Sequence, residues 1–346
     1  MNVKILTELL NKIKANGVGR DESINNFWIQ QLDRLRICLL EIKGADYSQE
    51  NVDKVLKALG YNEGKLTLGA GGNRRTKKVG EIIESATNLI PKQQKAFHAQ
   101  LTGDKSDIEH LCSLIFLSRK GVLDEYINFA DRLGLISSMP MARHWWYLKM
   151  LKSTLKDNPQ TVLEIGAGSG FFASLLMSEP DWSGSYYIVD LPEMLINSVA
   201  NLSNKFQNAF TSLNSVDSGS DFNINFLETS KIELVPTSSI DCSLNFNSLM
   251  EMQQSTRDYY IDQIYRVCKP GAMFYNVNRM QRSMANDDRA TYINNPLQYP
   301  YKMQDQIIYW GPDEFQQDYR SRFSYGATES FAIASMRRVN VSVVSG

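Results

Sequence analysis

The sequence predicts an α/β protein in which an all-helical N-terminal part precedes a Rossmann-like domain with a mostly parallel sheet. In the first part, apolar residues recur at helical spacing without strand-like alternation. From about residue 160, short β-rich runs alternate with helical stretches, and three closely spaced glycines follow the first run. The length of 346 residues corresponds to about two domains at ~150 residues each. We therefore expect a helical domain over 1–155 and a ligand-binding α/β domain over 156–346.

Apolar residues three or four positions apart predict the helices of the first part. Leu6, Leu9 and Leu10 begin the first pattern, which Gly17 ends. Helices are expected around residues 6–13, 27–39, 52–59, 106–115 and 123–130. We expect this part to cover a ligand pocket, to form a homodimer, or to do both.

Residues 69–78 interrupt the helical pattern with the glycine-rich, basic stretch G-A-G-G-N-R-R-T-K-K. Such a loop can grip a phosphate, but this one lacks the Gly-Lys-Ser/Thr ending of a P-loop and follows no strand. A solvated loop and a contact with an anionic ligand are both compatible with the pattern.

Short runs rich in β-branched and aromatic residues predict the strands of the second part. They are Thr161–Ile165, Tyr186–Val189, Ile224–Leu227, Ile240–Phe246 and Ala272–Val277. Helical stretches such as 171–177 and 259–267 separate them, which is typical of βαβ units and of a parallel sheet covered on both faces. The polar segment 281–306 reads as an insertion and candidate lid before the final strands.

Composition argues against several classes of protein. The 37 Lys and Arg residues balance the 38 Asp and Glu residues, so the net charge of −1 gives no field to attract nucleic acid or an anionic membrane. No apolar run approaches the ~20 residues of a membrane span, and residues 1–8 do not resemble a signal peptide. The four cysteines form no CxxC pair and no compact Asp/Glu/His cluster is visible. We expect a cytoplasmic protein that requires no metal.

The motif that carries the chemistry is the strand and turn V-L-E-I-G-A-G-S-G-F-F over residues 162–172. Its three glycines permit a tight turn that a ligand can approach along the backbone. A dinucleotide-binding fingerprint, G-x-G-x-x-G, would require glycine at position 171, where Phe171 stands. An acidic residue, Glu164, instead precedes the first glycine by two positions.

This motif resembles motif I of the class I S-adenosylmethionine (SAM)-dependent methyltransferases. Two further features carry the same resemblance: Asp190 ends the second strand twenty residues after Gly170, and K-P-G-A at 269–272 forms a turn before a late strand. The resemblance implies a mostly parallel seven-stranded sheet and an enzyme that uses SAM and releases S-adenosylhomocysteine (SAH). It also implies that Asp190 accepts the hydrogens of the ribose hydroxyls.

Ligands of open α/β sheets bind outside the carboxyl ends of the strands, which defines the candidate cofactor contacts. Glu228 and Thr229 follow the third strand and are expected at the adenine. Asn245 and Phe246 end the fourth strand and are expected beside the sulfonium. The candidate cofactor residues are Glu164, Gly166, Ala167, Gly168, Gly170, Phe171, Asp190, Leu191, Glu228, Thr229, Asn245 and Phe246.

The residues after the second and fourth strands narrow the class. The D-L-P that begins at Asp190 occurs in plant and fungal small-molecule O-methyltransferases, which typically place a histidine after the fourth strand, but residues 245–252 contain none. Residues 138–146, 188–193 and 247–252 instead resemble the bacterial sugar O-methyltransferases. This resemblance implies O-methylation of a sugar or glycosylated acceptor. The alternatives are O- or N-methylation of a non-sugar small molecule, and a domain that binds SAM without turnover.

Methyl transfer is an in-line displacement, so the enzyme must align the nucleophile and remove a proton from a hydroxyl acceptor. Glu251 follows the fourth strand and is the first candidate to take or orient that proton, and His144 is the second. Arg143 can clamp a phosphate or a carboxylate on the acceptor. The candidates for direct contact with the acceptor are Asn247, Tyr292 and Trp310.

Overall fold

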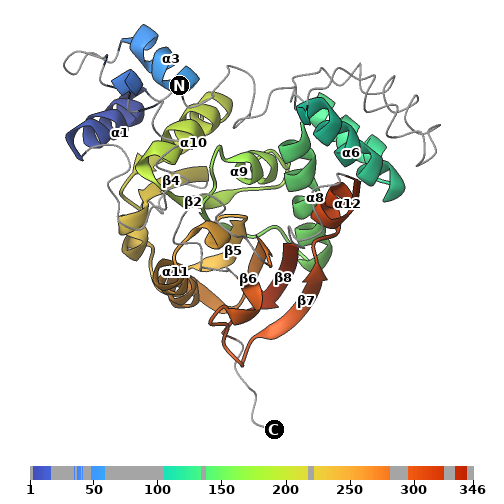
Figure 1. Cartoon of the computed structure of the whole chain (residues 1–346). Helices are drawn as coiled ribbons and strands as arrows, with labels where there is room; N and C mark the ends of the chain where they lie inside the picture. Colours follow the sequence, from blue (N-terminus) through green and yellow to red (C-terminus); the bar gives the residue numbers. More distant parts are fainter. Residues whose placement is uncertain are drawn as a thin grey trace, which may run out of the picture.

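In this computed structural model the described residues are 3–16, part of 35–41, 48–58, 105–133, 138–216, 222–280, 295–322 and 332–340. The basic stretch 69–78, most of the helix expected over 27–39, and Tyr292 lie outside them. The central feature of the described part is one eight-stranded sheet (Figure 1).

The strands are β1 (Thr161–Ile165), β2 (Gly184–Asp190), β3 (Phe210–Leu213), β4 (Phe222–Glu228), β5 (Ile240–Phe246), β6 (Cys268–Arg279), β7 (Gln306–Pro312) and β8 (Ala332–Arg338). Their order across the sheet is β3-β4-β2-β1-β5-β6-β8-β7; β8 runs antiparallel to both β6 and β7, and the other neighbouring strands pair in parallel. The mostly parallel, Rossmann-like sheet agrees with the prediction, but it has eight strands and not seven. The unpredicted strand is β3, whose four residues are too few for alternation to signal a strand.

The α-helices are α1 (Val3–Asn16), α3 (Gln49–Ala58), α6 (Lys105–Arg119), α7 (Leu123–Arg132), α8 (Met139–Thr154), α9 (Phe171–Leu176), α10 (Pro192–Lys205), α11 (Gln254–Val267) and α12 (Glu314–Arg322). Short 3-10 helices are η1 (Thr229–Leu234), η2 (Leu249–Glu251) and η3 (Pro296–Gln298). Alternate residues of a strand point to opposite faces of the sheet, and this produces two cores. Val162 and Ile188 belong to the core shared with α8, α9 and α10, whereas Leu163 and Tyr187 belong to the core shared with α11.

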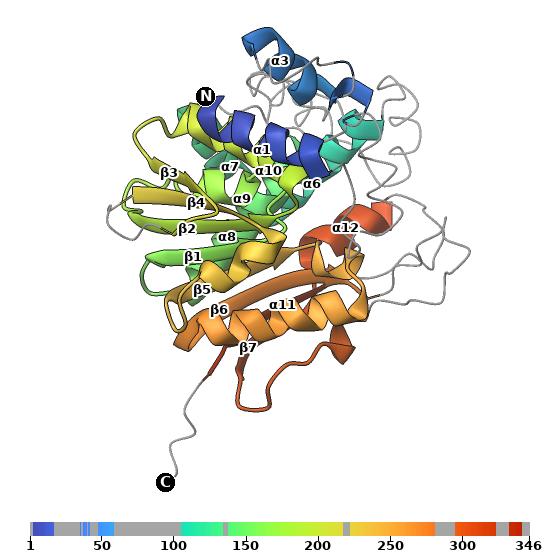
Figure 2. The same cartoon turned by 90° about the vertical axis from the view of Figure 1, so that its left-hand side faces the viewer.

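Four of the five helices predicted for the N-terminal part correspond to α1, α3, α6 and α7, but a separate helical domain is not confirmed. Leu6 and Leu9 of α1 and Trp145 of α8 share one core with Phe172 and Leu195 of the α/β part. α1 lies along α10 in both views of the molecule (Figures 1 and 2). The helices therefore cover one face of the sheet and add to its core. The boundary at residue 155 and dimerisation through this part stay predictions.

Sequence signals fix the start of α8, the helix that leads into β1. Ser138 caps the helix by accepting a hydrogen bond from the Met141 N–H, and Pro140 lies in the first turn.

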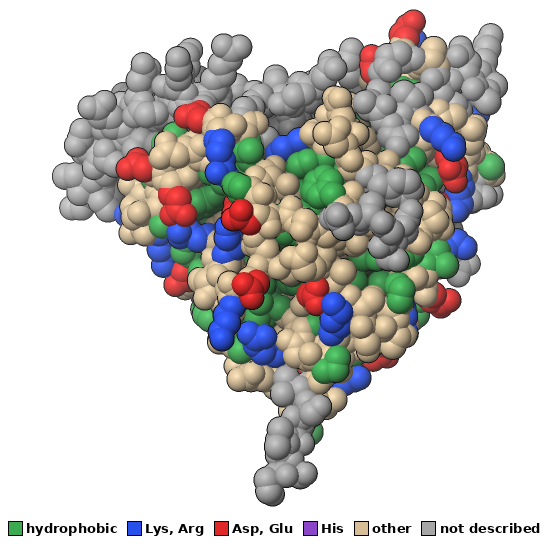
Figure 3. All heavy atoms as spheres, turned by 180° about the vertical axis from the view of Figure 1, so that it is seen from behind, with side chains coloured by type: hydrophobic (Ala, Val, Ile, Leu, Met, Phe, Trp, Pro, Cys, Tyr) green, Lys and Arg blue, Asp and Glu red, His purple; other side chains and the backbone are tan. Residues whose placement is uncertain are grey.

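The surface seen from behind mixes basic and acidic side chains, as expected for a net charge of −1 (Figure 3). None of the helices in the described ranges combines the length and apolar character that a bilayer crossing requires.

Candidate active site

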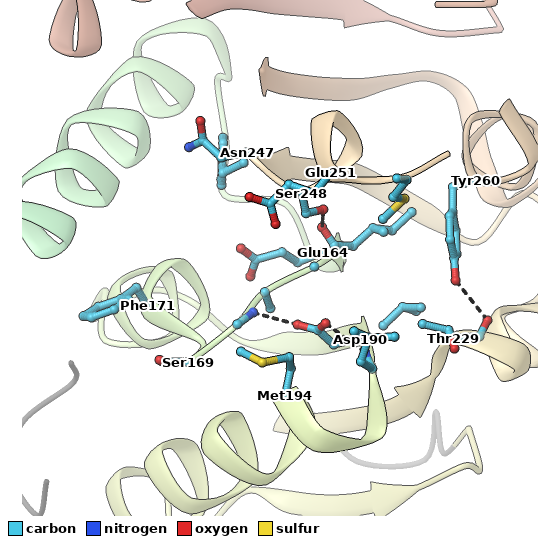
Figure 4. Close-up of a pocket in the computed structure, with 18 of the residues that line it drawn as sticks. Glu164, Ser169, Phe171, Asp190, Met194, Thr229, Asn247, Ser248, Glu251 and Tyr260 are labelled. Atoms are coloured by element: carbon cyan, nitrogen blue, oxygen red, sulfur yellow. Dashed lines mark hydrogen bonds between the residues drawn. The ribbon is translucent and has the colours of Figure 1, made fainter. Parts of the chain in front are cut away.

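A cavity of about 290 Å³ opens at the carboxyl ends of β1, β2 and β5 (Figure 4). Its walls come from the glycine-rich turn after β1, the end of β2 and the segment after β5. α8 supplies a further side through Arg143 and His144. This is the edge at which open α/β sheets bind ligands.

The turn after β1 depends on glycine. Gly166, Gly168 and Gly170 have φ values of 72°, 59° and 71°, in the left-handed region that side chains rarely adopt. Space is a second constraint at Gly166, because an added Cβ would lie 2.1 Å from Ser248 Oγ. Gly170 does not line the cavity but caps the start of α9. The turn therefore brings the segment after β5 into contact with the end of β1.

Asp190, at the end of β2, is held by the same turn. Its Oδ2 accepts a hydrogen bond from the Gly168 backbone N–H at 2.7 Å, and its Oδ1 accepts one from the Leu191 N–H at 2.8 Å. Burial raises the pKa of Asp190 to about 6, and these two N–H groups oppose the shift. A carboxylate offers about four acceptor positions. The remaining positions are available to a ligand in the cavity.

Two more carboxyl groups lie around the same space as Asp190 (Figure 4). Glu164 on β1 is 2% exposed and accepts a hydrogen bond from the Tyr186 hydroxyl at 2.7 Å. Burial raises the pKa of Glu164 to about 7; the Tyr186 hydroxyl opposes this shift and the charge of Asp190 adds to it. Glu251, after β5, also lines the cavity. The described residues form no cluster of three or more His, Cys, Asp or Glu side chains that could hold a metal ion.

A buried polar network fixes the wall after β5. Asn245 Nδ2 donates to the Ile165 carbonyl at 2.8 Å and to Ser248 Oγ at 2.6 Å. Asn245 Oδ1 accepts from the Leu249 N–H and from Asn278 Nδ2. Asn245 thus orients Ser248 from behind the wall and does not line the cavity, where the sequence had placed it.

His144 lies against the aromatic part of the wall. Its Nδ1 is 2.6 Å from the Pro140 carbonyl oxygen, and its ring stacks on Phe171 and meets Phe246 edge-on. Burial, followed by the charge of Arg143, lowers the pKa of His144 to about 3, although the Pro140 carbonyl opposes the shift. The imidazole is therefore neutral at pH 7 and is a weak base.

The structure brings most of the predicted site residues to this one cavity. They are Arg143, His144, Glu164, Gly166, Ala167, Gly168, Phe171, Asp190, Leu191, Thr229, Phe246, Asn247 and Glu251. They come from α8 and from the ends of four strands, so residues up to 108 positions apart in sequence (251 − 143) meet at one edge of the sheet.

Glu228 does not line the cavity, contrary to its predicted place at the adenine. Its Oε2 pairs with Lys12 Nζ of α1 at 2.5 Å, and its Oε1 accepts a hydrogen bond from Asn214 Nδ2 at 2.7 Å. These two partners hold the carboxylate outside the cavity wall. The next residue, Thr229, lines the cavity instead.

Trp310 also lies away from the cavity, contrary to its predicted contact with the acceptor. It is on β7, where the Arg337 guanidinium lies 4.8 Å from its ring centroid and Tyr301 meets it edge-on. These contacts give Trp310 a structural role at the edge of the sheet. Tyr292, the other aromatic residue predicted to contact the acceptor, lies outside the described residues.

Sequence reasoning missed several residues that line the cavity. They include Pro140, Ser169, Met194, Ser248, Met252, Thr256 and Tyr260. Ser248 and Met252 lie within segment 247–252, whose resemblance to the sugar O-methyltransferases could have indicated them as site residues. Met194 and Tyr260 come from helices that follow cavity-forming strands, and the hydroxyl of Tyr260 donates to the Thr229 carbonyl at 3.3 Å. That position after a strand is the one sequence signal they carry.

No protein-family profile and no curated protein sequence matches the chain. Among solved structures, a phosphoethanolamine N-methyltransferase from Haemonchus contortus, in complex with phosphomonomethylethanolamine and SAH, is 14% identical with a TM-score of 0.39; the match covers 64% of this chain and 58% of that one. The cyclase SpnF is 15% identical with a TM-score of 0.39, over 58% of this chain and 82% of the other. An arsenic(III) SAM methyltransferase from Chlamydomonas reinhardtii is 16% identical with a TM-score of 0.31, over 53% and 64%.

Proposed function

We propose that the protein is a SAM-dependent methyltransferase. The observation that carries this proposal is the anchored carboxylate of Asp190, which lies between Phe171 on one side of the cavity and Thr229 and Tyr260 on the other (Figure 4). SAM is an elongated ligand whose ribose diol lies between the methionine part and the adenine. A carboxylate that accepts hydrogen bonds from both ribose hydroxyls fits this position.

The charges around the cavity support the same proposal. SAM carries a sulfonium and an ammonium group, and both are attracted by carboxylates. Glu164, Asp190 and Glu251 line the cavity. Burial disfavours the ionised forms of Glu164 and Asp190 when no cation is near, which accounts for the raised pKa values of these two groups. A cationic ligand would restore the charged forms.

In this proposal SAM supplies an electrophilic methyl group, and the side chains of the chain align the acceptor and move its proton. Glu251 is the proposed base, because it lines the cavity after β5, next to the strand end expected beside the sulfonium. His144 is a poorer base, because burial lowers the pKa of its imidazole to about 3. Its ring packs between Phe171 and Phe246, and the three rings exclude water from that side of the cavity.

We propose a hydroxyl of a sugar or glycosylated molecule as the acceptor. The support is the sequence of segment 247–252, which places Asn247 and Glu251 together on the cavity. A second candidate is a non-sugar small molecule with a hydroxyl or an amine. Phe171, Phe246 and Tyr260 favour that candidate, because they make part of the wall aromatic.

Release of SAH from SAM in the presence of an acceptor tests the proposal. Purified protein would be incubated with SAM and a panel of neutral sugars, acidic sugars, sugar phosphates, phenols and amines, and SAH would be measured. Acceptor-dependent SAH release, together with a product heavier by one methylene unit, is the expected result. Protein that binds SAM but releases no SAH with any acceptor would favour a domain without turnover.

The role of Glu251 is tested by Glu251→Gln. Loss of a general base lowers turnover by about 10²–10⁴-fold, and SAH affinity should change little. Glu50→Gln is the matched control, because Glu50 is on α3 and its side chain is 79% exposed. Turnover of Glu251→Gln within threefold of wild type would exclude Glu251 as the base.

A further inference from the structure

Two buried nitrogen atoms on the cavity wall have no hydrogen-bond partner among the described residues. They are Nε of Arg143 and Nδ2 of Asn247, and both residues line the cavity. Leaving a buried donor unsatisfied costs about 1–3 kcal/mol, so most such groups in proteins are paired. Two of them in one cavity indicate a ligand group that accepts hydrogen bonds there.

The orientation of the Asn247 amide is fixed from behind. Gln316 Nε2 donates to Asn247 Oδ1 at 3.1 Å and to the Tyr147 hydroxyl at 3.1 Å. The Tyr147 hydroxyl in turn donates to Asp313 Oδ2 at 2.8 Å. Because Oδ1 is the atom that faces Gln316, the Nδ2 donor is the atom left for a ligand.

The backbone of Asn247 is also constrained. Its φ is 64°, a left-handed value that is uncommon for a residue with a side chain, and its N–H donates to the Val277 carbonyl at 2.8 Å. Asparagine adopts this region more readily than most other residues with a side chain, so the conformation costs little here. Asn247 lies across the cavity from Asp190 (Figure 4).

The cavity wall carries charged side chains of both signs. Among the described lining residues, Arg143 is the permanently charged cation, and the acidic residues Glu164, Asp190 and Glu251 belong to the strand ends. An arginine and an amide that each present an unpartnered buried N–H to one cavity can together bind a carboxylate or a phosphate. The carboxylates suit the cationic groups of SAM, and the Arg143 guanidinium suits an anion.

We propose that the acceptor carries an anionic group, a carboxylate or a phosphate, which Arg143 and Asn247 bind beside the reacting hydroxyl. This inference rests on the proposed methyltransferase function and adds the charge of its acceptor. Neutral molecules of the same shape are then poor acceptors, because they leave both donors unpaired.

Anion binding to the SAH-saturated protein tests the proposal. Thermal unfolding would be followed with SAH alone and with added inorganic phosphate or acetate, at constant ionic strength maintained with chloride. Wild-type protein is expected to gain stability with one of the two anions beyond the chloride control, and the preferred anion identifies the group. No gain with either anion would overturn the proposal.

Three variants locate the effect. Arg143→Met and Asn247→Gly should weaken the binding of the preferred anion at least tenfold, with SAH affinity within threefold of wild type. Glycine suits the left-handed backbone at position 247, so its effect is that of the missing side chain. Arg119→Met is the matched control, because Arg119 is a surface residue whose side chain is 56% exposed; it should behave as wild type.

Other outcomes would overturn the inference. Anion stabilisation that persists in Arg143→Met would place the anion elsewhere. A tenfold loss of SAH affinity in Arg143→Met would assign the guanidinium to the cofactor carboxylate. Failure of wild-type protein to bind SAH is a separate result, because it would contradict the methyltransferase function itself.

Discussion

The ends of β2 and β4 lie side by side, and each ends in an acidic residue, yet only one of these residues faces the cavity. Asp190 and Glu228 are direct partners in the strand register. Asp190 is anchored by the N–H of Gly168 in the glycine turn, whereas Glu228 is paired with Lys12 and Asn214. Position at the carboxyl edge of a sheet therefore does not decide a residue's role. The groups that hold its side chain decide it.

The largest effect is expected at the turn that anchors Asp190. Gly166→Ala places a Cβ 2.1 Å from Ser248 Oγ at a φ of 72°. The backbone must shift, and we expect loss of SAH binding together with a stability loss of about 2–4 kcal/mol, typical of overpacking combined with backbone strain. Calorimetry and denaturant unfolding measure the two effects.

Gly121→Ala is the matched control for this variant. Gly121 has a φ of 69°, but a Cβ there would have nothing within 4 Å. Strain alone should cost about 1–2 kcal/mol, and SAH affinity should be unchanged. If Gly166→Ala bound SAH as wild type does, the close approach at Ser248 would have no part in the site.

The second effect distinguishes Glu228 from Asp190, because we expect the loss of Glu228 to lower stability without changing cofactor affinity. Glu228→Ala removes the partner of Lys12 and of Asn214, and we expect a stability loss of about 1–2 kcal/mol with SAH affinity unchanged. A double-mutant cycle with Lys12→Met should give a coupling of up to ~1 kcal/mol, since Lys12 is 37% exposed and is partly screened. An equal loss of SAH affinity in Glu228→Ala and Asp190→Ala would erase the distinction between them.

The third effect is the pH dependence of SAM affinity. The raised pKa values of Glu164, about 7, and Asp190, about 6, leave both carboxyls partly protonated below pH 7. A cation favours their ionised forms, so SAM should bind about tenfold more tightly at pH 8 than at pH 5.5, and Glu164→Gln should flatten this dependence. An affinity that falls as pH rises would contradict the charge argument.

The raised pKa values of Glu164 and Asp190 also predict how the stability of the ligand-free protein depends on pH. A carboxyl whose pKa is raised on folding binds more protons in the folded state, so its contribution makes stability fall as pH rises from about 4 to about 7. Glu164→Gln removes one such group. It should therefore unfold at a higher temperature than wild type at pH 8 but not at pH 5, which scanning calorimetry can measure.

The smallest effect is expected from removal of the Tyr186 hydroxyl, which donates a hydrogen bond to Glu164. Tyr186→Phe removes the hydroxyl that donates to Glu164 at 2.7 Å and opposes the rise in its pKa. The pH profile of SAM affinity should move to higher pH by less than one unit. A shift to lower pH would show that the hydroxyl does not stabilise the charged carboxylate.

Local sequence patterns were sufficient to predict the part of the site around Asp190. Gly166, Gly168 and Asp190 are within 25 residues of one another, and the strand that precedes each feature is visible as an apolar run. The turn and the strand end must meet because parallel neighbours share one carboxyl edge. The mostly parallel sheet was predictable for the same reason.

Long-range contacts account for what the sequence did not predict. The direction of Glu228 depends on Lys12, 216 positions earlier (228 − 12), and the amide of Asn247 is set by Gln316, 69 positions later. Neither partner belongs to a motif. The shared core of α1 with the sheet depends on similar contacts, since helical periodicity shows that a face is apolar but not what covers it.

Calorimetry of SAH binding to wild type, Asp190→Ala and Glu228→Ala tests the central claim most directly. We predict micromolar binding by wild type, affinity within threefold for Glu228→Ala, and a loss of roughly 100-fold for Asp190→Ala, as expected when two hydrogen bonds to a charged group are removed. No binding of SAH or SAM by wild type, or equal binding by wild type and Asp190→Ala, would contradict the claim that this cavity holds the cofactor.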